Sequence, residues 1–395
     1  MYRRHAEIRL RAALADTPVV FLNGPRQAGK TTLARQFHGR YFTFDDPITL
    51  AAAQDPLGFI AQDPEPMILD EVQKVPALAP VLKLRVDQDR RPGRYLLTGS
   101  AQAQVLPDLA RELVGRMEVL ELYPLSRGEI EGVRERFLDR LWAGDFPPGD
   151  RPACDWRAML EAGGFPEALA RTDAERRSAW FRSYVGNLLD RDVRDLAAIE
   201  GRTQLPRLAQ LLAARSASLL NLADIGRAIE VPHSTARRYL ALLERTFLVT
   251  LLPAWSRNLS QRLVKSPKLH FLDSGVLGHL CPPSPGPWLE SFAAAELFKQ
   301  LAAFAPLHRL YHFRTAAGRE VDFVLEGPDG RVAGIEVKSS ATLGAHDFRG
   351  LNALAELAGG DFAGGAVLYT GTTAIRFAPR LWALPLSCLW EGERL

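Results

Sequence analysis

Cysteine and long hydrophobic runs are scarce in this sequence of 395 residues. The three cysteines, Cys154, Cys281 and Cys388, are far apart and form no C-x-x-C pair, which argues against a disulfide framework and a thiolate metal site. No apolar run approaches the roughly 18 residues of a membrane span, and the charged N-terminal segment MYRRHAEIRL does not fit a signal peptide. We therefore expect a cytoplasmic protein without a membrane partner.

The sequence also lacks a strong net charge and contains little lysine. The formal net charge is only +3, so the overall balance does not by itself indicate a nucleic-acid partner. Only seven of the 49 basic residues are lysines, and two of them, Lys30 and Lys338, fall within the motifs described below. What is present is ordinary: 47% hydrophobic and 24% charged residues, as in a folded protein with two or three domains.

Short apolar runs alternate with helix-length segments in the first part of the chain. They lie at residues 19–22, 41–44, 67–69 and 95–97. Such alternation predicts a buried parallel sheet covered by helices, that is, an α/β fold. We assign residues 1–125 to this domain.

Three further regions follow, each with its own pattern. Residues 126–200 carry long charged segments with helical spacing, which predict a helical lid or bundle. Residues 201–255 contain two helical patterns around Val231-Pro232-His233 and then a β-rich segment, an order that resembles a helix-turn-helix followed by a wing. In residues 256–395 a loop around CPPSPGPW precedes a last α/β region.

A phosphate-binding motif stands in the first domain, where GPRQAGKT matches G-x-x-x-x-G-K-[ST] between a predicted strand and a helical pattern. Glycines let the backbone N–H groups approach phosphates, the lysine would lie between the β- and γ-phosphates, and the Thr31 hydroxyl is a candidate Mg²⁺ ligand. The residues that we expect to hold the nucleotide are Gly24, Pro25, Arg26, Gln27, Ala28, Gly29, Lys30, Thr31 and Thr32.

The catalytic groups of such a site are expected at the ends of neighbouring strands. Asp70 and Glu71 follow the apolar run at 67–69, so Asp70 would hold Mg²⁺ and Glu71 would orient and deprotonate the attacking water. The next strand ends in Thr98-Gly99-Ser100, where Thr98 or Ser100 would sense the γ-phosphate. Arg116 is a candidate for transition-state charge, from within the chain or from a neighbouring subunit.

The second helix of the helix-turn-helix pattern carries Arg237 and Arg238, which are candidates for DNA contact. The alternative is that the module serves dimerisation or packing between domains.

A possible nuclease-like set occurs near the C-terminus. Asp322, Glu336 and Lys338 lie on two strand patterns and would project from one edge, the arrangement of metal-dependent phosphodiester cleavage. Glu290 and Glu296 on an upstream helix are candidates for a further carboxylate. The alternative is a solvated pair of strands. His308 and His312 have no accompanying acid, and we propose no zinc site.

The order of these motifs resembles that of a known prokaryotic family of predicted ATPases, in which an AAA-type domain is joined to a C-terminal domain of unknown function 4143. The likeness covers nearly the whole chain and rests on the segments GPRQAGKTTL, ILDEVQ, YLLTGS, the GR before LELYPLS, GGFPEAL, RLVKSPKLHFLDSGVLGHL, EVDFVLE and IEVKSS. The resemblance implies ATP as the ligand of loop 24–32, a winged helix, and a C-terminal fold similar to restriction endonucleases. It does not imply nuclease activity, since that fold is also used without catalysis.

Three functions follow as hypotheses. The first is a Mg-dependent ATPase that acts as a conformational switch or motor. The second is a metal-dependent nuclease gated by the ATPase. The third is a non-catalytic DNA-binding or scaffold protein that ATP stabilises by binding only the folded state. DNA, a protein client and a second copy of the chain stay open as partners.

Overall fold

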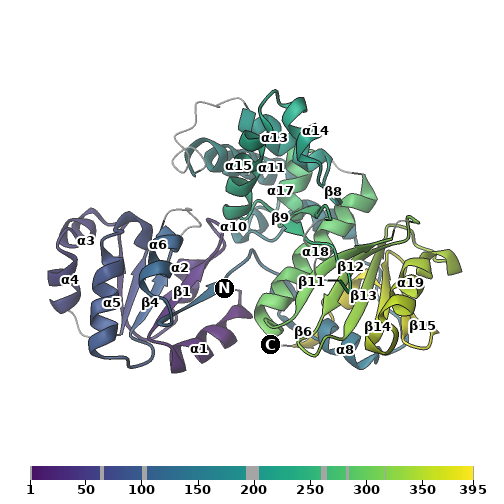
Figure 1. The fold of residues 1–395 in the computed structure, drawn as a ribbon, viewed down its shortest axis with the longest axis horizontal. Coiled ribbons are helices and arrows are strands. Elements are labelled where there is room, and N and C mark those ends of the chain that lie inside the picture. Colours follow the sequence, from purple (N-terminus) through teal and green to yellow (C-terminus); the bar gives the residue numbers. More distant parts are fainter. Residues whose placement is uncertain are drawn as a thin grey trace.

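The computed structural model describes residues 2–62, 66–99, 105–192, 204–258, 265–281, 284–315 and 317–394. Figure 1 shows three parts: an N-terminal α/β part, a mainly helical part above the centre, and a C-terminal α/β part. Both chain ends lie toward the middle of the view, between the first and the third parts.

A five-stranded parallel sheet forms the centre of the first part, with the strand order β2-β3-β4-β1-β5. The strands are β1 (Val19–Asn23), β2 (Arg40–Thr43), β3 (Met67–Asp70), β4 (Tyr95–Thr98) and β5 (Met117–Glu121). The four predicted strands are confirmed to within about a residue at each end. β4 separates β3 from β1, so the acidic strand end is two strands away from the phosphate-binding motif.

Helices cover both faces of this sheet. They are α1 (Ala6–Asp16), α2 (Lys30–Ala34), α3 (Pro47–Ala52), α4 (Pro56–Gln62), α5 (Leu78–Gln88) and α6 (Val105–Glu112). Val19 and Phe21 of β1 share a core with α5, whereas Val20 and Leu22 share the opposite core with α1. Because successive side chains of a strand alternate between faces, a strand buried on both faces is a continuous apolar run.

The region 126–200 is less uniform than the predicted helical lid. Its helices and strands within residues 126–192, the part of this region that the structure describes, are α7 (Arg127–Glu131), β6 (Val133–Glu135), α8 (Phe137–Ala143), β7 (Gly149–Asp150), α9 (Trp156–Ala162), α10 (Pro166–Leu169), α11 (Ala174–Asn187) and the π-helix η2 (Leu188–Asp192). Gly132 ends α7 in a left-handed conformation, φ +68°, which glycine adopts without steric strain. β6 and β7 then pair with strands from the C-terminal part, so the first 25 or so residues of this region belong with that part.

The two expected helices around Val231-Pro232-His233 are present, as α14 (Leu222–Ala228) and α15 (His233–Arg245). α13 (Gln204–Ala214) precedes them, and α17 (Ser274–Leu280) follows. The strands β8 (Ser218–Leu219), β9 (Val249–Leu252) and β10 (Lys268–Phe271) form an antiparallel sheet in the order β8-β10-β9. This unit extends past residue 255, because β10 completes its sheet.

A mixed sheet in the order β11-β12-β13-β14-β16-β15-β7 forms the third part. Its strands from this end of the chain are β11 (Arg309–Arg314), β12 (Glu320–Glu326), β13 (Val332–Lys338), β14 (Phe362–Tyr369), β15 (Thr373–Ala378) and β16 (Leu381–Pro385), while β17 (Gly392–Arg394) pairs with β6. α18 (Pro285–Phe304) and α19 (Arg349–Ala358) pack against β13. α18 also contacts α1, α9, α17 and β10, so this one helix touches all three parts.

Candidate functional site

The phosphate-binding motif forms the turn between β1 and α2. A Cβ added to Gly24 would lie 2.2 Å from the Leu122 carbonyl oxygen, so only glycine fits at this close approach of two backbones. Gly29 has φ +94°, a left-handed conformation, and stands directly before α2. Both glycines of the motif are therefore required by backbone geometry.

Lys30 lies over the loop and is buried. Its Nζ donates hydrogen bonds to the carbonyl oxygens of Gly24, at 2.9 Å, and Pro25, at 2.7 Å. These acceptors are neutral, so a phosphate that enters the loop offers the ammonium a charged acceptor in place of neutral ones.

Three hydroxyl groups surround the Asp70 carboxylate at the end of β3. Thr31 Oγ1 lies 3.0 Å from Oδ2, Tyr41 donates to Oδ2 at 2.6 Å, and Thr98 Oγ1 donates to Oδ1. The structure thus brings together the two candidate Mg²⁺ ligands, Thr31 and Asp70, and adds Thr98 from the intervening strand β4. Tyr41 was not found from the sequence, because its pairing with Asp70 depends on the adjacency of β2 and β3.

Glu71 occupies an unusual backbone position. Its φ of +61° is left-handed, which is rare and strained for a residue other than glycine. Its carboxylate accepts a hydrogen bond from Gln73 Nε2. Burial raises the pKa of the Glu71 carboxyl, and the Gln73 hydrogen bond and the Lys30 charge lower it by less, so the pKa lies above its ordinary value.

A cavity of about 590 Å³ adjoins the loop. The phosphate-binding side is lined by Gly29, Lys30, Thr31, Thr32 and Glu71, together with Arg26, Gln27, Leu33 and Gln36. The remaining lining residues are Tyr2, Arg4, Leu125, Pro166 and Glu167, and the last two belong to α10 of the helical part. Two parts of the molecule therefore bound the same cavity.

Of the other predicted catalytic residues, Ser100 cannot be placed and Arg116 does not join this site. Ser100 lies outside the described residues. Arg116 forms an ion pair with Asp87 at 2.5 Å and directly precedes Met117, which pairs with Val19 at the start of β1. The phosphate loop follows the other end of β1, so Arg116 lies at the opposite edge of the sheet and is not positioned to act on its own chain's loop.

The four C-terminal candidates come together at one end of β12 and β13. Glu290 of α18, Asp322 of β12, and Glu336 and Lys338 of β13 line a cavity of about 760 Å³. Asp322 Oδ2 accepts the backbone N–H of Val337 at 2.9 Å. Lys338 pairs with Glu336 at 2.6 Å.

Lys268 of β10 occupies the centre of this acidic cluster. Its side chain is 3% exposed, and its Nζ lies 2.7 Å from Glu320, 2.9 Å from Glu290 and 3.1 Å from Asp322. Sequence reasoning missed Lys268 and Glu320, although a lysine beside the apolar LHF of a buried strand is a visible signal in a chain with so few lysines.

The charges of this cluster are unevenly shared. Burial lowers the pKa of Lys268, but the charges of Asp322 and Glu290 and the contact with Glu320 raise it by more. Burial raises the pKa of Glu320, whereas its hydrogen bond and charge interaction with Lys268 lower it overall. Burial and the Asp322 charge raise the pKa of Glu336 to about 8. Lys268 is therefore an ammonium held among the carboxylates of Asp322, Glu290 and Glu320.

Other candidate ligands are placed elsewhere. Glu296 pairs with Lys299 at 2.7 Å and accepts the backbone N–H of Arg127, so it joins α18 to α7 and not to the acidic cluster. His312 is buried with Nε2 3.1 Å from the Ser266 carbonyl oxygen. Within the ranges that the structure describes, no three His, Cys, Asp or Glu side chains are arranged to hold a metal ion.

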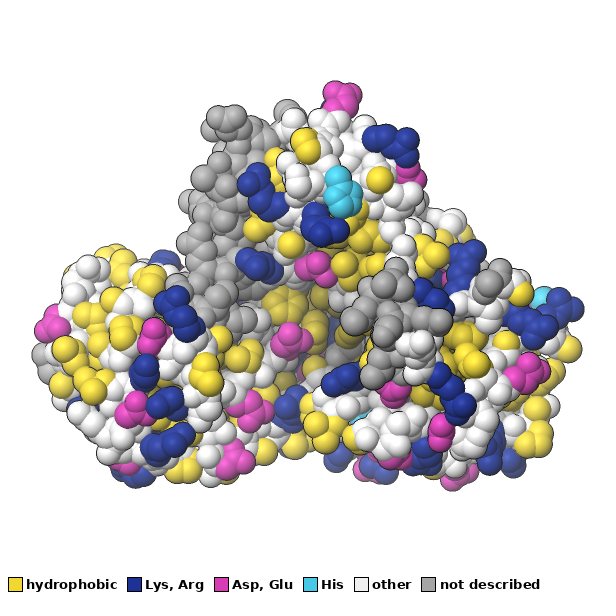
Figure 2. Space-filling model, viewed as in Figure 1, with side chains coloured by type: hydrophobic (Ala, Val, Ile, Leu, Met, Phe, Trp, Pro, Cys, Tyr) yellow, Lys and Arg dark blue, Asp and Glu magenta, His cyan; other side chains and the backbone are white. Residues whose placement is uncertain are grey.

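Arg237 and Arg238 lie on the exposed side of α15, opposite the buried Ala236, Tyr239 and Leu240. Figure 2 shows lysine or arginine side chains and a histidine on the upper part of the molecule. Arg238 lies 5.8 Å from the Tyr239 ring centroid. Both side chains are accessible for contact with a partner.

Comparison with protein families identifies three successive domains. Residues 16–131 match the family described as AAA domain, residues 154–285 match the domain of unknown function DUF8612, and residues 285–389 match the domain of unknown function DUF4143. No described helix is both long enough and apolar enough to cross a membrane.

Two mycobacterial proteins are similar over most of this chain. They are the uncharacterized protein Rv2008c of Mycobacterium tuberculosis and the uncharacterized protein Mb2031c of Mycobacterium bovis. Each is 32% identical over 354 residues, which span 86% of this chain and 74% of the relative.

Solved structures give weaker likenesses. The Walker-type ATPase PABY2304 of Pyrococcus abyssi is 16% identical, with a TM-score of 0.43, over 71% of this chain and 96% of that chain. AMPPCP-bound DnaA from Aquifex aeolicus is 16% identical, with a TM-score of 0.26, over 60% of this chain and 85% of that chain. Scores this low carry no functional argument.

Proposed function

Since the chain belongs to the family in which an AAA domain is joined to a C-terminal domain of unknown function 4143, we propose that it binds Mg-ATP at loop 24–32 and hydrolyses it. The observation that carries this proposal is the meeting of Lys30, Thr31 and Asp70 around one cavity-lining loop. The loop requires glycine at two positions, as a phosphate cradle does: a Cβ at Gly24 would meet the Leu122 carbonyl oxygen, and Gly29 has a φ of +94°.

The donor set suits a magnesium ion, because Thr31 and Asp70 offer a hydroxyl and a carboxylate in direct contact, and Mg²⁺ prefers oxygen ligands. When bound, Mg²⁺ neutralises charge on the β- and γ-phosphates. Thr98 and Tyr41 hold the Asp70 carboxylate in place through their hydroxyls. The choice of adenine over guanine rests on the family, because we identify no residue of the site that reads the base.

Glu71 is the proposed general base. Gln73 fixes its carboxylate through a hydrogen bond, and the raised pKa makes it a stronger proton acceptor than an exposed glutamate. In this role Glu71 orients the attacking water and takes its proton. Ser100 remains a proposed γ-phosphate contact, and Arg116 remains a proposed charge donor only to a neighbouring copy of the chain.

A role as a conformational switch follows from the two-sided cavity. Nucleotide in the loop would lie against Pro166 and Glu167 of the helical part as well as against Lys30. A ligand shifts an equilibrium between two arrangements only by its difference in affinity for them, and contacts to both parts supply such a difference. The client of this switch is a protein, DNA or a second copy of the chain.

Steady-state hydrolysis of Mg-ATP, with and without duplex and single-stranded DNA, tests this function. We expect turnover that Lys30→Ala and Glu71→Gln each reduce by at least about a hundredfold. Lys74→Ala and Glu112→Gln are the matched controls, because both residues lie in the first part but outside the cavity lining, and both should keep wild-type turnover. Turnover that survives both active-site substitutions would refute the assignment.

A metal-dependent nuclease in the third part is the second candidate, favoured by the cavity that joins Glu290, Asp322, Glu336 and Lys338. We propose with it a C-terminal fold like that of restriction endonucleases. Lys268 lies where a cation would meet three of the carboxylates, so metal binding requires this ammonium to move. The nuclease hypothesis predicts DNA cleavage with Mg²⁺ or Mn²⁺ that is abolished in Asp322→Ala and in Glu336→Ala. If the wild type cleaves no form of DNA, the hypothesis is wrong.

DNA binding by a winged helix is the proposed role of α14, α15 and the sheet β8-β10-β9, since Arg237 and Arg238 are exposed on the second helix. Binding should weaken as salt rises, and Arg237→Ala with Arg238→Ala should lower both the affinity and the salt dependence. If ATP binds without hydrolysis, the third hypothesis, a DNA-binding or scaffold protein stabilised by ATP, becomes the better account.

A further inference from the structure

Arg4 is a buried arginine beside the phosphate loop, and none of the roles above uses it. Its side chain is 8% exposed, and its guanidinium donates to three acceptors from three segments. Nη1 donates to the Ala28 carbonyl oxygen at 2.6 Å, Nη2 to the Tyr123 carbonyl oxygen at 2.7 Å, and Nε to Glu129 Oε1 at 3.1 Å. Burying a charge costs desolvation free energy unless the charge is paired and hydrogen-bonded. The three acceptors meet this condition for Arg4.

The contact with Ala28 bears directly on phosphate binding. The Ala28 carbonyl and the Gly29 N–H belong to one peptide unit, and in a trans peptide the two groups point in opposite directions. Ala28 is fully buried, whereas Gly29 lines the cavity. A charged donor on the carbonyl fixes the peptide plane and polarises the unit, which makes the Gly29 N–H a stronger donor.

Glu129 holds Arg4 in this orientation. Besides Arg4, its Oε1 accepts the backbone N–H of His5 at 2.7 Å, and its Oε2 accepts the backbone N–H of Ser126 at 3.0 Å as part of the cap of α7. Burial raises the pKa of the Glu129 carboxyl, but the charges of Arg4 and His5 lower it overall, so the carboxylate is ionised. His5 in turn pairs with Glu135 at 2.9 Å.

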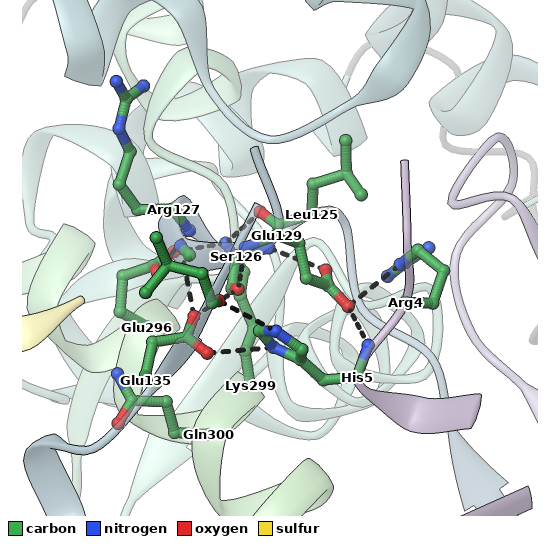
Figure 3. Close-up of polar contacts among 12 residues, drawn as sticks. Arg4, His5, Leu125, Ser126, Arg127, Glu129, Glu135, Glu296, Lys299 and Gln300 are labelled. Atoms are coloured by element: carbon green, nitrogen blue, oxygen red, sulfur yellow. Dashed lines mark hydrogen bonds and ion pairs between the residues drawn. The ribbon is translucent and has the colours of Figure 1, made fainter. Parts of the chain in front are cut away.

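Figure 3 shows this network continuing toward α18. Glu296 of α18 accepts the Arg127 backbone N–H at 2.7 Å, and Lys299 of α18 donates to the Leu125 carbonyl oxygen at 3.0 Å. The segment that holds Arg4 is therefore fastened to the helix that also carries Glu290, so Arg4 and Glu129 link the peptide at Gly29 to α18, outside the N-terminal α/β part.

We propose that Arg4 is a positioning residue for nucleotide binding, which orients and polarises the Ala28–Gly29 peptide so that the Gly29 N–H is held ready for a phosphate oxygen. The proposal rests on the proposed function, because it assigns a role within that site. Arg4 acts through the peptide and takes no part in proton transfer.

Calorimetric titration with Mg-ADP and with inorganic tripolyphosphate tests the proposal in the full chain. We expect Arg4→Met to weaken binding of both ligands by roughly tenfold to a hundredfold, the loss of a charged hydrogen bond. Arg4→Lys should lose less, since it keeps a charge near Glu129. Arg9→Met is the matched control, because Arg9 also ties α1 to another segment, through Ala302, but makes no contact with the loop. It should bind within about twofold of wild type.

The amide proton of Gly29 supplies a readout that a purely structural role would not move. In the nucleotide-free protein we expect its NMR resonance to shift upfield in Arg4→Met, because the peptide loses polarisation, and to keep its position in Arg9→Met. Unchanged affinity in a folded Arg4→Met, or an unchanged Gly29 amide, overturns the proposal. If Arg4→Met does not fold, Arg4→Lys must show weaker ligand binding and an upfield shift of the Gly29 amide proton, both smaller than expected for Arg4→Met.

Failure of the proposed function is distinguishable from failure of this inference. If the wild-type chain binds neither nucleotide nor tripolyphosphate, the ATPase assignment is wrong. If the wild type binds and Arg4→Met binds equally well, only the role of Arg4 is wrong.

Discussion

The phosphate loop and the C-terminal acidic cluster each contain a buried lysine, but the two lysines have different surroundings. Lys30 donates to two backbone carbonyls of its own loop, and the wall of its cavity also carries Arg4, Arg26 and the carboxylates of Glu71 and Glu167. Lys268 lies within 3.1 Å of three carboxylates from α18 and β12. At the loop, the three basic side chains Arg4, Arg26 and Lys30 outnumber the two carboxylates of the cavity wall, which suits a polyanion. At the cluster, an ammonium already occupies the place that a metal cation would take.

This difference separates the two candidate activities. At the loop, the glycines and Lys30 can accept phosphate groups without displacing a buried charged side chain. At the cluster, a divalent ion competes with an ammonium that is well paired and buried, and removing a buried partner from such a group is strongly unfavourable. The nucleotide site is therefore ready for its ligand, and the acidic cluster is stabilised without one.

The largest effect is expected from Lys268→Met. It leaves the buried Asp322 and the half-buried Glu320 without their counter-charge, so the unfolding free energy should fall by about 3–5 kcal/mol near neutral pH. Denaturant unfolding followed by circular dichroism measures this. Lys265→Met, three residues earlier and exposed, should change the unfolding free energy by less than about 0.5 kcal/mol.

A second substitution checks the cause of that loss. Asp322→Asn in the Lys268→Met background removes one of the unpaired charges and should restore part of the stability. If Lys268→Met leaves the unfolding midpoint unchanged, Lys268 is not a stabilising counter-charge, and the contrast with Lys30 fails.

Gly24→Ala tests the geometry of the loop. Its Cβ would meet the Leu122 carbonyl oxygen at 2.2 Å, so either the loop or the segment directly after β5 must shift. We expect a loss of about 1–3 kcal/mol of stability together with loss of nucleotide binding. Gly186→Ala in α11, where a Cβ meets nothing within 4 Å, should instead be neutral or stabilising by up to about 1 kcal/mol. Equal behaviour of the two variants in melting and binding assays would contradict the close approach.

Tyr41→Phe tests the support of Asp70. It removes one hydroxyl donor from the carboxylate and should cost about 0.5–1.5 kcal/mol of stability. The Mg²⁺ concentration needed for half-maximal hydrolysis should rise, because Asp70 is less firmly held. Tyr123→Phe is the control, since the Tyr123 hydroxyl donates a hydrogen bond to Glu121 and not to the loop. An identical magnesium requirement in wild type and Tyr41→Phe would argue against a role for Tyr41.

The smallest effect concerns pH. Burial lowers the pKa of His5, but the hydrogen bond and charge of Glu135 and the charge of Glu129 raise it above the ordinary 6.5. Protonated His5 therefore stabilises the folded state below about pH 6.5, and this contribution is lost as the pH rises through the folded pKa. His5→Gln should lower stability more at about pH 5.5 than at about pH 8.5, by roughly 1 kcal/mol or less. An equal loss of stability at the two pH values would contradict this role of His5.

The sequence allowed prediction of what depends on local pattern. The phosphate loop, the four strands before residue 100 and the helices α14 and α15 carry period, capping or motif signals within a few residues of chain. The gathering of Asp322, Glu336 and Lys338 was also predictable, since β12 and β13 are adjacent strands with alternating side chains.

The rest depends on contacts between distant segments. Arg4 and Glu129 are 125 positions apart, and Lys268 meets Asp322 across 54 positions, so neither pairing has a local signal. β6 and β7 have three and two residues, too few for a strand period, and their partners lie near the C-terminus. The sequence proposed Arg116 for transition-state charge because it follows a helical pattern. Only the register of β5 against β1 shows that it lies at the sheet edge opposite the phosphate loop of its own chain.

Binding of a nonhydrolysable Mg-ATP analogue, measured by titration calorimetry with the wild type, Lys30→Ala and Lys268→Met, tests the central claim most directly. The account predicts that the wild type binds one equivalent, that Lys30→Ala weakens binding by at least about a hundredfold, and that Lys268→Met, under conditions where it is folded, binds as the wild type does. A folded wild-type protein that binds no nucleotide, or a Lys30→Ala variant with unchanged affinity, would contradict it.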